Sequence, residues 1–399
     1  MFQHSSASAS AQFQQKLIKL PICKKLMKFD ELLMIPGPVQ VHSRILNAMA
    51  KPLIGHRTPE FSDIMKNCTL GLKELFGTDG DVYLISGSGT AGMEAAISSF
   101  SKVSRITCID NGKFGDRLCR IASRYTEVDA LRFEWGESID LEKVKESLEN
   151  GSEAVAFVHN ETSTGILNPA REIAKIAKKH SALVIMDGIT SVGGDEVKMD
   201  EWGIDVAIVG SQKCLGIPPG LAAVAVNERA WEFYNEKAPF YLDLMAYKKK
   251  LKDWQTPYTP AVPLFVALNE AIEMIKEEGL ENRIQRHRKF SRAVREWAVN
   301  AGLELFPRLN EYSSYSNTVT AIKMPEGITD KELRGTLKQE YSITISGGQE
   351  HLKGKIFRIG TMGNIGKREV VATLMAVEDI LTRKGCAVPA INHALEVLK

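Results

Sequence analysis

The chain has 399 residues, of which 51 are basic and 49 acidic, so its formal net charge is +2. This balance gives no reason to expect a nucleic-acid partner, and no apolar run reaches the roughly 20 residues of a membrane helix. Six scattered cysteines without a CxxC pair fit a reducing compartment and predict no metal site. A chain of this length predicts a large domain and a smaller one.

The first 28 residues differ from the rest, with five lysines, no acidic residue and a start rich in Ser, Ala and Gln. Such a segment is typical of a transit peptide, although it lacks arginine, or of a disordered tail. A third interpretation is that the natural start is Met27. We expect a cytoplasmic protein, while organellar import through residues 1–28 stays open.

Short apolar segments alternate with amphipathic ones through the middle of the chain. One expected helix covers residues 170–179, with Ile173, Ile176 and Ala177 on one face. The alternation predicts an α/β fold, in which a mainly parallel mixed sheet is covered by helices on both sides. The expected strands are 82–85, 106–109, 154–158, 183–186, 206–209 and 221–226.

The C-terminal part has a different pattern. A long charged helix is expected over 269–301, with a kink or a break at Gly279. Strands near 318–323, 343–346 and 356–359, with helices between and after them, predict a small α+β domain. The predicted organisation is therefore an N-terminal extension (1–28), an entry segment with the large domain (29–268), and a linking helix with the small domain (269–399).

Lys213 follows the buried strand expected at 206–209 and lies in a loop that Pro218 and Pro219 stiffen. Among apolar neighbours an ammonium group is poorly hydrated, so its pKa falls toward neutrality. A neutral amine can attack an aldehyde and form a Schiff base, the linkage that holds pyridoxal phosphate. Taken alone, a lysine beside a strand is more often a solvated surface residue.

Asp187 ends the apolar segment 183–186, at the carboxyl end of an expected parallel strand, where ligands bind in such sheets. A buried carboxylate requires a cationic partner, because an unpaired buried charge is costly. A protonated pyridine nitrogen fits this requirement. Helix capping or a pair with a structural arginine is the alternative.

The segment Ser86-Gly87-Ser88-Gly89-Thr90 leads from an apolar strand into a helix of small residues. Free amide groups and the helix dipole at such a start attract a phosphate, and the hydroxyl groups add donors. The pattern is neither a P-loop nor a dinucleotide-binding fingerprint. A plain turn is the simpler interpretation of this segment alone.

Together, five motifs resemble class V aminotransferases of the pyridoxal-phosphate fold-type I superfamily, in the serine–pyruvate/alanine–glyoxylate branch. The resemblance runs from about Phe29 to about Arg383 and keeps the family's order and distances. The motifs are Ser-Gly-Ser-Gly-Thr at 86–90, Thr-Ser-Thr-Gly at 162–165, Asp-Gly-Ile-Thr-Ser at 187–191, Ser-Gln-Lys at 211–213 and Phe-Arg-Ile-Gly at 357–360.

The resemblance implies a role for each matching residue around the cofactor. Lys213 matches the Schiff-base lysine, and Asp187 matches the residue that keeps the pyridine nitrogen protonated. The phosphate contacts are Ser88, Gly89, Thr90 and Gln212, the ring contacts are Phe114 and Ile189, and the hydroxyl beside the ring oxygen belongs to Thr162. Family members often have His at the position of Thr90, and many have Trp at that of Phe114.

The resemblance also implies a homodimer, in which Thr256 and Thr259 reach the cofactor phosphate of the neighbouring subunit. Arg358 matches the arginine that binds the substrate α-carboxylate, a role that suits a planar guanidinium. Thr162 matches a substrate contact as well. Gly37, in the Pro-Gly-Pro turn of the entry segment, matches a backbone contact to the same carboxylate.

The predicted function is transamination of a small L-amino acid, serine or alanine, with glyoxylate or pyruvate as acceptor. Aspartate and ureidoglycine stay open as donors, and Arg57 favours aspartate if its guanidinium reaches the pocket; its alternative is a structural ion pair. A cysteine desulfurase requires a nucleophilic cysteine on a small-domain loop, but residues 346–351 have none and Cys386 lies near the chain end. A non-catalytic regulator of this fold usually has a DNA-binding domain, which residues 1–28 cannot supply. A plain structural role leaves Lys213, Asp187 and Arg358 without a reason to occur together.

Overall fold

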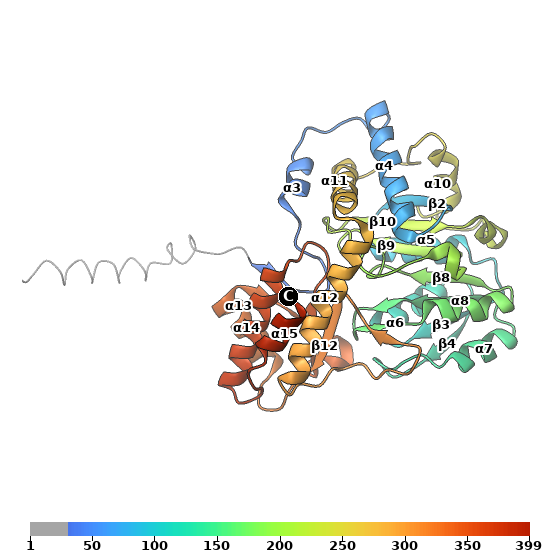
Figure 1. The fold of residues 1–399 in the computed structure, drawn as a ribbon. Coiled ribbons are helices and arrows are strands. Elements are labelled where there is room, and N and C mark those ends of the chain that lie inside the picture. Colours follow the sequence, from blue (N-terminus) through green and yellow to red (C-terminus); the bar gives the residue numbers. More distant parts are fainter. Residues whose placement is uncertain (1–30) are drawn as a thin grey trace, which may run out of the picture.

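The computed structural model describes residues 31–399, so the three interpretations of residues 1–28 lie outside the described part of the chain. Its main feature is a seven-stranded sheet flanked by helices, which confirms the α/β fold (Figure 1). In spatial order the strands are β2 (Asp81–Ser86), β10 (Leu221–Val226), β9 (Val206–Gly210), β8 (Leu183–Asp187), β5 (Ala154–Val158), β3 (Arg105–Asp110) and β4 (Glu127–Arg132).

The strand directions place one edge of the sheet at the site. β9, β8, β5, β3 and β4 are parallel to one another, whereas β10 is antiparallel to both of its neighbours, β9 and β2. β2 therefore runs in the same direction as the parallel strands. The carboxyl ends of six strands meet at one edge, where open α/β sheets bind their ligands.

The helices of the larger part form for reasons that the sequence shows. α4 begins after Thr58, whose hydroxyl accepts from the amide of Phe61, and ends at Gly77, whose φ of 63° suits glycine. The helix at 170–179 has the predicted bounds and buries Ile173. The helices are α3 (Ser43–Met49), α4 (Pro59–Phe76), α5 (Gly89–Ser99), α6 (Lys113–Ala122), α7 (Leu141–Glu149), α8 (Ala170–Lys179), α9 (Met199–Trp202), α10 (Leu244–Leu251) and α11 (Val262–Glu278), with a 3₁₀ turn η1 (Glu228–Phe233).

Gly279 breaks the long helix that the sequence predicts over 269–301. The chain forms α11 up to Glu278 and α12 (Leu280–Asn300) after the glycine, whose φ is 81°. Such a φ is costly for other residues, so Gly279 allows the change of direction. α12 then runs along the C-terminal elements, beside β12 (Val319–Lys323) and α15 (Ile391–Val397) (Figure 1).

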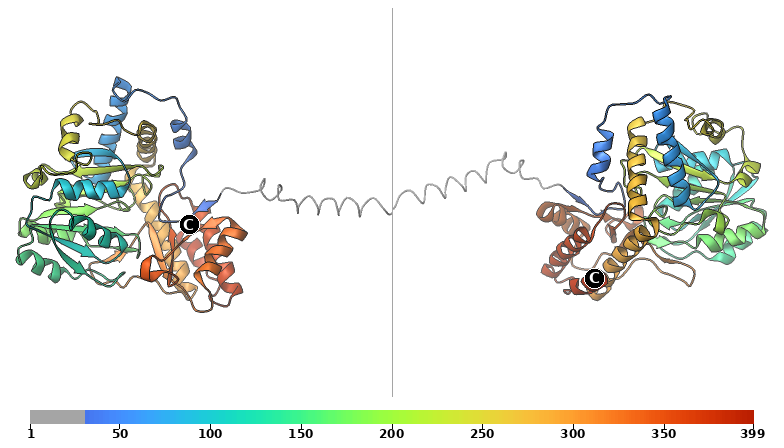
Figure 2. Two further views of the ribbon diagram at one scale, coloured as in Figure 1. Left: turned by 180° about the vertical axis from the view of Figure 1, so that it is seen from behind. Right: turned by 45° about the horizontal axis from the view of Figure 1, so that its top comes forward.

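The C-terminal elements form a second hydrophobic core, which includes Met34 from the entry segment and Trp297 from α12. They gather on one side of the larger part in both views of Figure 2. The expected strand at 343–346 is instead two short strands in different sheets, because β13 pairs with β1 and β14 pairs with β15. The bounds are β1 (Leu32–Leu33), β12 (Val319–Lys323), α13 (Asp330–Tyr341), β13 (Ile343–Thr344), β14 (Ser346–Gly347), η2 (Glu350–Leu352), β15 (Ile356–Gly360), α14 (Lys367–Arg383) and α15 (Ile391–Val397).

A small sheet of β6 (Asn160–Glu161), β7 (Ile166–Leu167) and β11 (Ser314–Tyr315) connects the two parts. The division into domains at 268/269 stays a prediction, since β1 and Met34 join the C-terminal core from the other end of the chain. Within residues 31–399, no helix combines the length and apolar content that a membrane crossing requires.

Candidate active site

Lys213 lies just beyond the carboxyl end of β9 and is buried, with 8% of the residue exposed. Its Nζ donates to the backbone oxygen of Pro36, so the entry segment covers the lysine. Gly37 has a φ of 89°, and a Cβ there would lie 2.6 Å from Cδ of Lys213. Only glycine therefore lets the Pro-Gly-Pro turn approach this closely. Burial lowers the pKa of Lys213 to about 8.

Asp187 ends β8 on the same edge of the sheet and is 3% exposed. One of its carboxylate oxygens, Oδ1, accepts from the amide of Ile189 at 2.8 Å. No basic side chain of residues 31–399 forms an ion pair with it, and burial raises the pKa of Asp187 to about 7. The carboxylate is thus placed for a cationic partner that the described chain does not itself supply.

Asp187→Asn is expected to stabilise the cofactor-free protein at pH 8. Because the pKa of folded Asp187 is raised, its contribution to stability is full below pH about 4 and is lost as pH rises through about 7. At pH 8 the charged side chain destabilises the fold by on the order of 4 kcal/mol, and asparagine removes that cost. Thermal unfolding at pH 5 and pH 8 tests this, with the exposed cap variant Asp140→Asn as control. An equal change in melting temperature at both pH values would contradict it.

The start of α5 lies against the same cluster. Ser88 precedes the first turn without a side-chain cap, so the amides of Gly89 and Thr90 are available to a ligand. A Cβ on Gly89 would lie 2.7 Å from Cδ1 of Ile189, which shows how closely helix and β8 loop approach. Thr90 accepts from Arg117 at 3.1 Å. Oε1 of Gln212 is buried and has no hydrogen-bond partner in the described residues.

Phe114, Thr162 and Arg358 complete the cluster around Lys213. The Phe114 ring centre lies 5.9 Å from Nζ of Lys213. The Thr162 hydroxyl lies 2.6 Å from that of Thr190, and its backbone oxygen accepts from Nη1 of Arg358 at 2.8 Å. Nε and Nη2 of Arg358 donate to the backbone oxygen of Gly347. Burial lowers the pKa of Arg358 to about 10, so the guanidinium is charged at neutral pH, and no acidic side chain within 31–399 forms an ion pair with it.

Thr256 and Thr259 lie apart from these residues. Thr256 is buried and donates to the backbone oxygen of Tyr258, whereas Thr259 is exposed. Of the described contacts, no hydrogen bond joins either threonine to the residues around Lys213. Arg57 donates to Oε1 of Gln255 and to the backbone oxygens of Thr256 and Pro257. It therefore holds the threonine segment, through hydrogen bonds rather than the ion pair that was the alternative.

Sequence reasoning missed two charged residues at the site, Glu161 and Arg117. Glu161 is fully buried on β6 and accepts from the amides of Phe114 and Gly115. The Arg117 guanidinium lies 4.9 Å from the centre of the Phe114 ring. Both could be found from the sequence, since Glu161 follows an apolar strand as Asp187 does, and Arg117 lies three residues after Phe114 on one helix face.

Among the cysteines of residues 31–399, neither Cys214 nor Cys386 gives a sign of nucleophilic chemistry. Cys214 is adjacent to Lys213, but its thiol is buried and donates to the backbone oxygen of Thr190. Burial raises the pKa of Cys214 to about 12, so the thiolate is scarce at neutral pH. Cys386 donates to the backbone oxygen of Glu326 within the C-terminal part.

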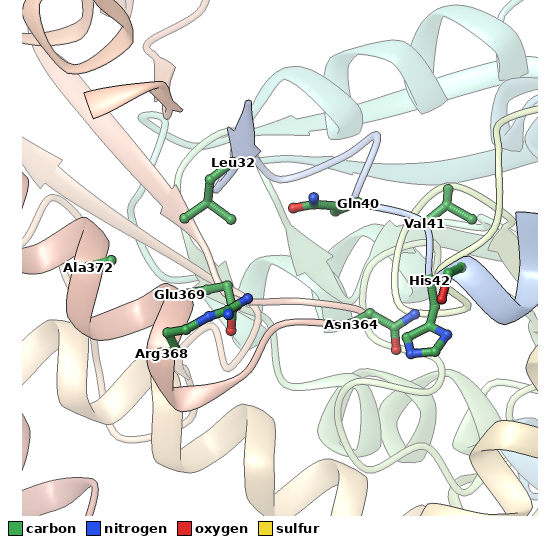
Figure 3. A pocket seen from close by; sticks show the side chains of 9 residues that line it. Leu32, Gln40, Val41, His42, Asn364, Arg368, Glu369 and Ala372 are labelled. Carbon is green, nitrogen blue, oxygen red and sulfur yellow. The ribbon is translucent and has the colours of Figure 1, made fainter. Parts of the chain in front are cut away.

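A cavity of about 570 Å³ lies between the entry segment and α14. Figure 3 shows Gln40, Val41 and His42 facing Asn364 and Arg368 across it. The cavity is not lined by Lys213 or by any other predicted site residue, and Arg368 is paired with its neighbour Glu369. It is therefore distinct from the cluster at the carboxyl edge of the sheet.

Comparison with known proteins decides the family. A profile described as aminotransferase class-V matches residues 40–365. The chain belongs to the class-V aminotransferases. An uncharacterized aminotransferase of Methanocaldococcus jannaschii is 47% identical over 93% of this chain and 99% of its own length. The crystal structure of ureidoglycine–glyoxylate aminotransferase from Bacillus subtilis has a TM-score of 0.86 at 34% identity, covering 92% of this chain and 98% of the other.

One relative is named as part of a hydrogenase, which is a different class of enzyme. A protein of Synechococcus called the small subunit of a soluble hydrogenase is 41% identical over 90% of this chain and 95% of its own length. In the described part of this chain, no group of three or more His, Cys, Asp or Glu side chains is placed to hold a metal ion. Class-V aminotransferases depend on pyridoxal phosphate, and this chain is an enzyme of that class.

Proposed function

We propose that this class-V aminotransferase transfers the amino group of a small L-amino acid, serine or alanine, to glyoxylate or pyruvate. The observation that carries the proposal is the buried amine of Lys213, placed near Phe114 at the edge of the sheet that also holds Asp187. Its pKa of about 8 leaves a useful fraction of neutral amine at physiological pH.

The residues present fit pyridoxal phosphate. The uncapped first turn of α5 and the orphaned Oε1 of Gln212 indicate where a polar group is expected. The side-chain amide of Gln212 and the hydroxyls of Ser88 and Thr90 add donors for a phosphate there. The unpaired carboxylate of Asp187 suits a protonated pyridine nitrogen.

Each remaining residue has a task in this proposal. Phe114 and Ile189 would cover the two faces of the ring, and the Thr162 hydroxyl would lie beside the ring oxygen. Arg358 and the backbone at Gly37 would bind the α-carboxylate of the substrate. When bound, the cofactor supplies an aldehyde that condenses with amines and a ring that accepts electron density from Cα.

Lys213 has a second task as general acid–base. Its amine would take the proton from Cα of the amino acid and deliver it to the carbon of the cofactor that carried the aldehyde. Asp187, negatively charged, would keep the pyridine nitrogen protonated during this transfer. Because donor and acceptor use one site in turn, a double-displacement rate pattern is expected.

The choice of donor rests on Arg57. Relatives at 32–34% identity are named for serine, alanine, aspartate and ureidoglycine as donors to glyoxylate. Arg57 is exposed, and its donors are directed to Gln255, Thr256 and Pro257, outside the group of residues around Lys213. This arrangement supports serine or alanine rather than aspartate.

We also propose a cytoplasmic homodimer, in which Thr256 and Thr259 contact the cofactor phosphate of the partner subunit. The exposure of Thr259 supports this, as does an aromatic group beside it, in which Phe240 is 81% exposed and Tyr241 stacks on Tyr258. Large exposed aromatic side chains are enriched at interfaces. Sedimentation velocity of the full chain tests the dimer.

The visible absorption spectrum of the holoenzyme tests the function. A yellow band that bleaches with L-serine or L-alanine, and returns with glyoxylate, supports the proposal, and D-serine is the control. Bleaching with L-aspartate alone would keep the class and change the donor. No band after addition of pyridoxal phosphate would overturn the assignment of Lys213.

A further inference from the structure

Glu161 is a buried acid at the centre of the site, and its role lies outside those proposed so far. It ends β6, directly before Thr162, and is 0% exposed. A carboxylate removed from water is costly unless it is well hydrogen-bonded. No basic side chain within residues 31–399 forms an ion pair with Glu161, so its hydrogen bonds must offset the cost.

Two pairs of donors surround the carboxylate. Oε2 accepts from the amides of Phe114 and Gly115, each at 3.0 Å, in the first turn of α6. Oε1 accepts from the amide of Ser163 at 2.9 Å and from its hydroxyl at 2.5 Å. Burial raises the pKa of Glu161, and the four donors reduce this rise without cancelling it. The arrangement favours a carboxylate over an amide, because every partner is a donor.

Glu161 therefore caps α6 from a distant part of the chain. The local cap position is Gly112, which has no side chain to accept from the helix amides. A Cβ on Gly112 would overlap Cγ of Glu161, so the glycine makes room for the carboxylate. The amide of Lys113, the first residue of α6, donates to the Ser163 hydroxyl at 2.9 Å, so Ser163 also helps to cap this helix.

The capped turn carries the residues that face the site. Phe114 belongs to this turn and lies 5.9 Å from Nζ of Lys213. One turn later, Arg117 lies over the Phe114 ring and donates to Thr90 at the start of α5. On the other side of Glu161, the backbone of Thr162 holds Arg358. One carboxylate thus connects the ring-covering helix with the segment that orients the substrate-binding arginine.

We propose that Glu161 is a positioning residue, which caps α6 and thereby holds Phe114 and Arg117 against the cofactor site. Its effect on cofactor affinity rests on the proposed function, because it acts through the contact of Phe114 with the cofactor ring. Its effect on the first turn of α6 does not, and it exists in the cofactor-free protein.

Glu161→Gln tests the proposal with two measurements. The glutamine keeps the shape of the glutamate side chain. Because both carboxylate oxygens accept from donors, the NH₂ group faces donors in either orientation of the amide. In the cofactor-free protein, we expect faster hydrogen exchange of the amides of Phe114 and Gly115. In the holoenzyme, we expect the dissociation constant of pyridoxal phosphate to rise about 10-fold, the scale of one charged hydrogen bond.

Glu332→Gln is the matched control. Glu332 also caps a helix, α13, and accepts from the amide and hydroxyl of one residue, Thr329. It lies away from the site, so its loss should leave exchange at α6 and cofactor affinity unchanged. Equal values for wild type and Glu161→Gln in both measurements would overturn the proposal.

Gly112→Ala is the second variant, and it decides the matter if Glu161→Gln does not fold. It keeps the charge of Glu161 but displaces the carboxylate, so the same two changes are expected. Unchanged exchange and affinity in Gly112→Ala would reject positioning by this contact. Failure of the wild type to bind pyridoxal phosphate would instead reject the proposed function, and the exchange measurement would still report on the cap.

Discussion

Replacement of Lys213 by alanine is expected to abolish transamination and leave the fold intact. The amine has no substitute, because no other lysine of the described residues is placed at the Phe114 ring in the same way as Lys213. Loss of the general acid–base alone costs about 10²–10⁴ in rate, and loss of the covalent attachment adds to this. Steady-state rates with L-serine and glyoxylate measure the effect.

The fold should survive because the Lys213 amine costs stability in the folded protein. Its lowered pKa means that the stability it contributes is full above pH about 10.5 and is lost as pH falls through about 8. At pH 7 the cofactor-free alanine variant should therefore melt no lower than wild type. Lys198→Ala is the control, since Lys198 is an exposed partner of Glu196 and Glu201. Normal turnover by Lys213→Ala would remove the basis of the proposed mechanism.

The sheet could be predicted from the sequence because its central strands are buried on both faces. Such strands are continuous apolar runs, as in Leu221–Val226 and in Leu183–Asp187 up to its final aspartate. β4 escaped prediction because it is an edge strand, half-buried over Val128–Leu131 and with an acidic residue in its middle. The two-residue strands β13 and β14 are predicted as a single strand, because their assignment to different sheets depends on pairing partners elsewhere in the chain.

The site residues also divide into those that the strand pattern places and those whose role depends on distant contacts. Lys213 and Asp187 each follow an apolar strand, so the strand pattern alone places them at one edge of the sheet. Glu161 also comes after an apolar strand, but its role depends on hydrogen bonds to amides of α6 that are 46 and 47 residues away in the sequence. Nothing local in the sequence indicates such a partner. Arg57 likewise acquires its role from a segment about 200 residues later.

Replacement of Arg358 by lysine is expected to lower kcat/KM about 100-fold for the donor and for the acceptor alike. The guanidinium is fixed in a fork, with Nη1 on the backbone of Thr162 and with Nε and Nη2 on that of Gly347. A lysine keeps the charge but cannot make these contacts and bind a carboxylate in two places. Removal of a buried charged contact costs about 2–5 kcal/mol, and the retained charge places the loss near the lower end.

The pattern of the loss separates this role from a structural one. Both substrates present the same kind of carboxylate. If Arg358 binds it, the replacement must raise KM for both substrates by a similar factor and leave cofactor binding unchanged. Arg229→Lys is the matched control, because Arg229 is already paired with Asp205, which precedes β9 at the opposite edge of the sheet. An effect on one substrate only, or a loss of cofactor in the Arg358→Lys variant, would show that Arg358 acts elsewhere. A similar rise in KM for both would connect the orienting contact at Thr162 directly to substrate recognition.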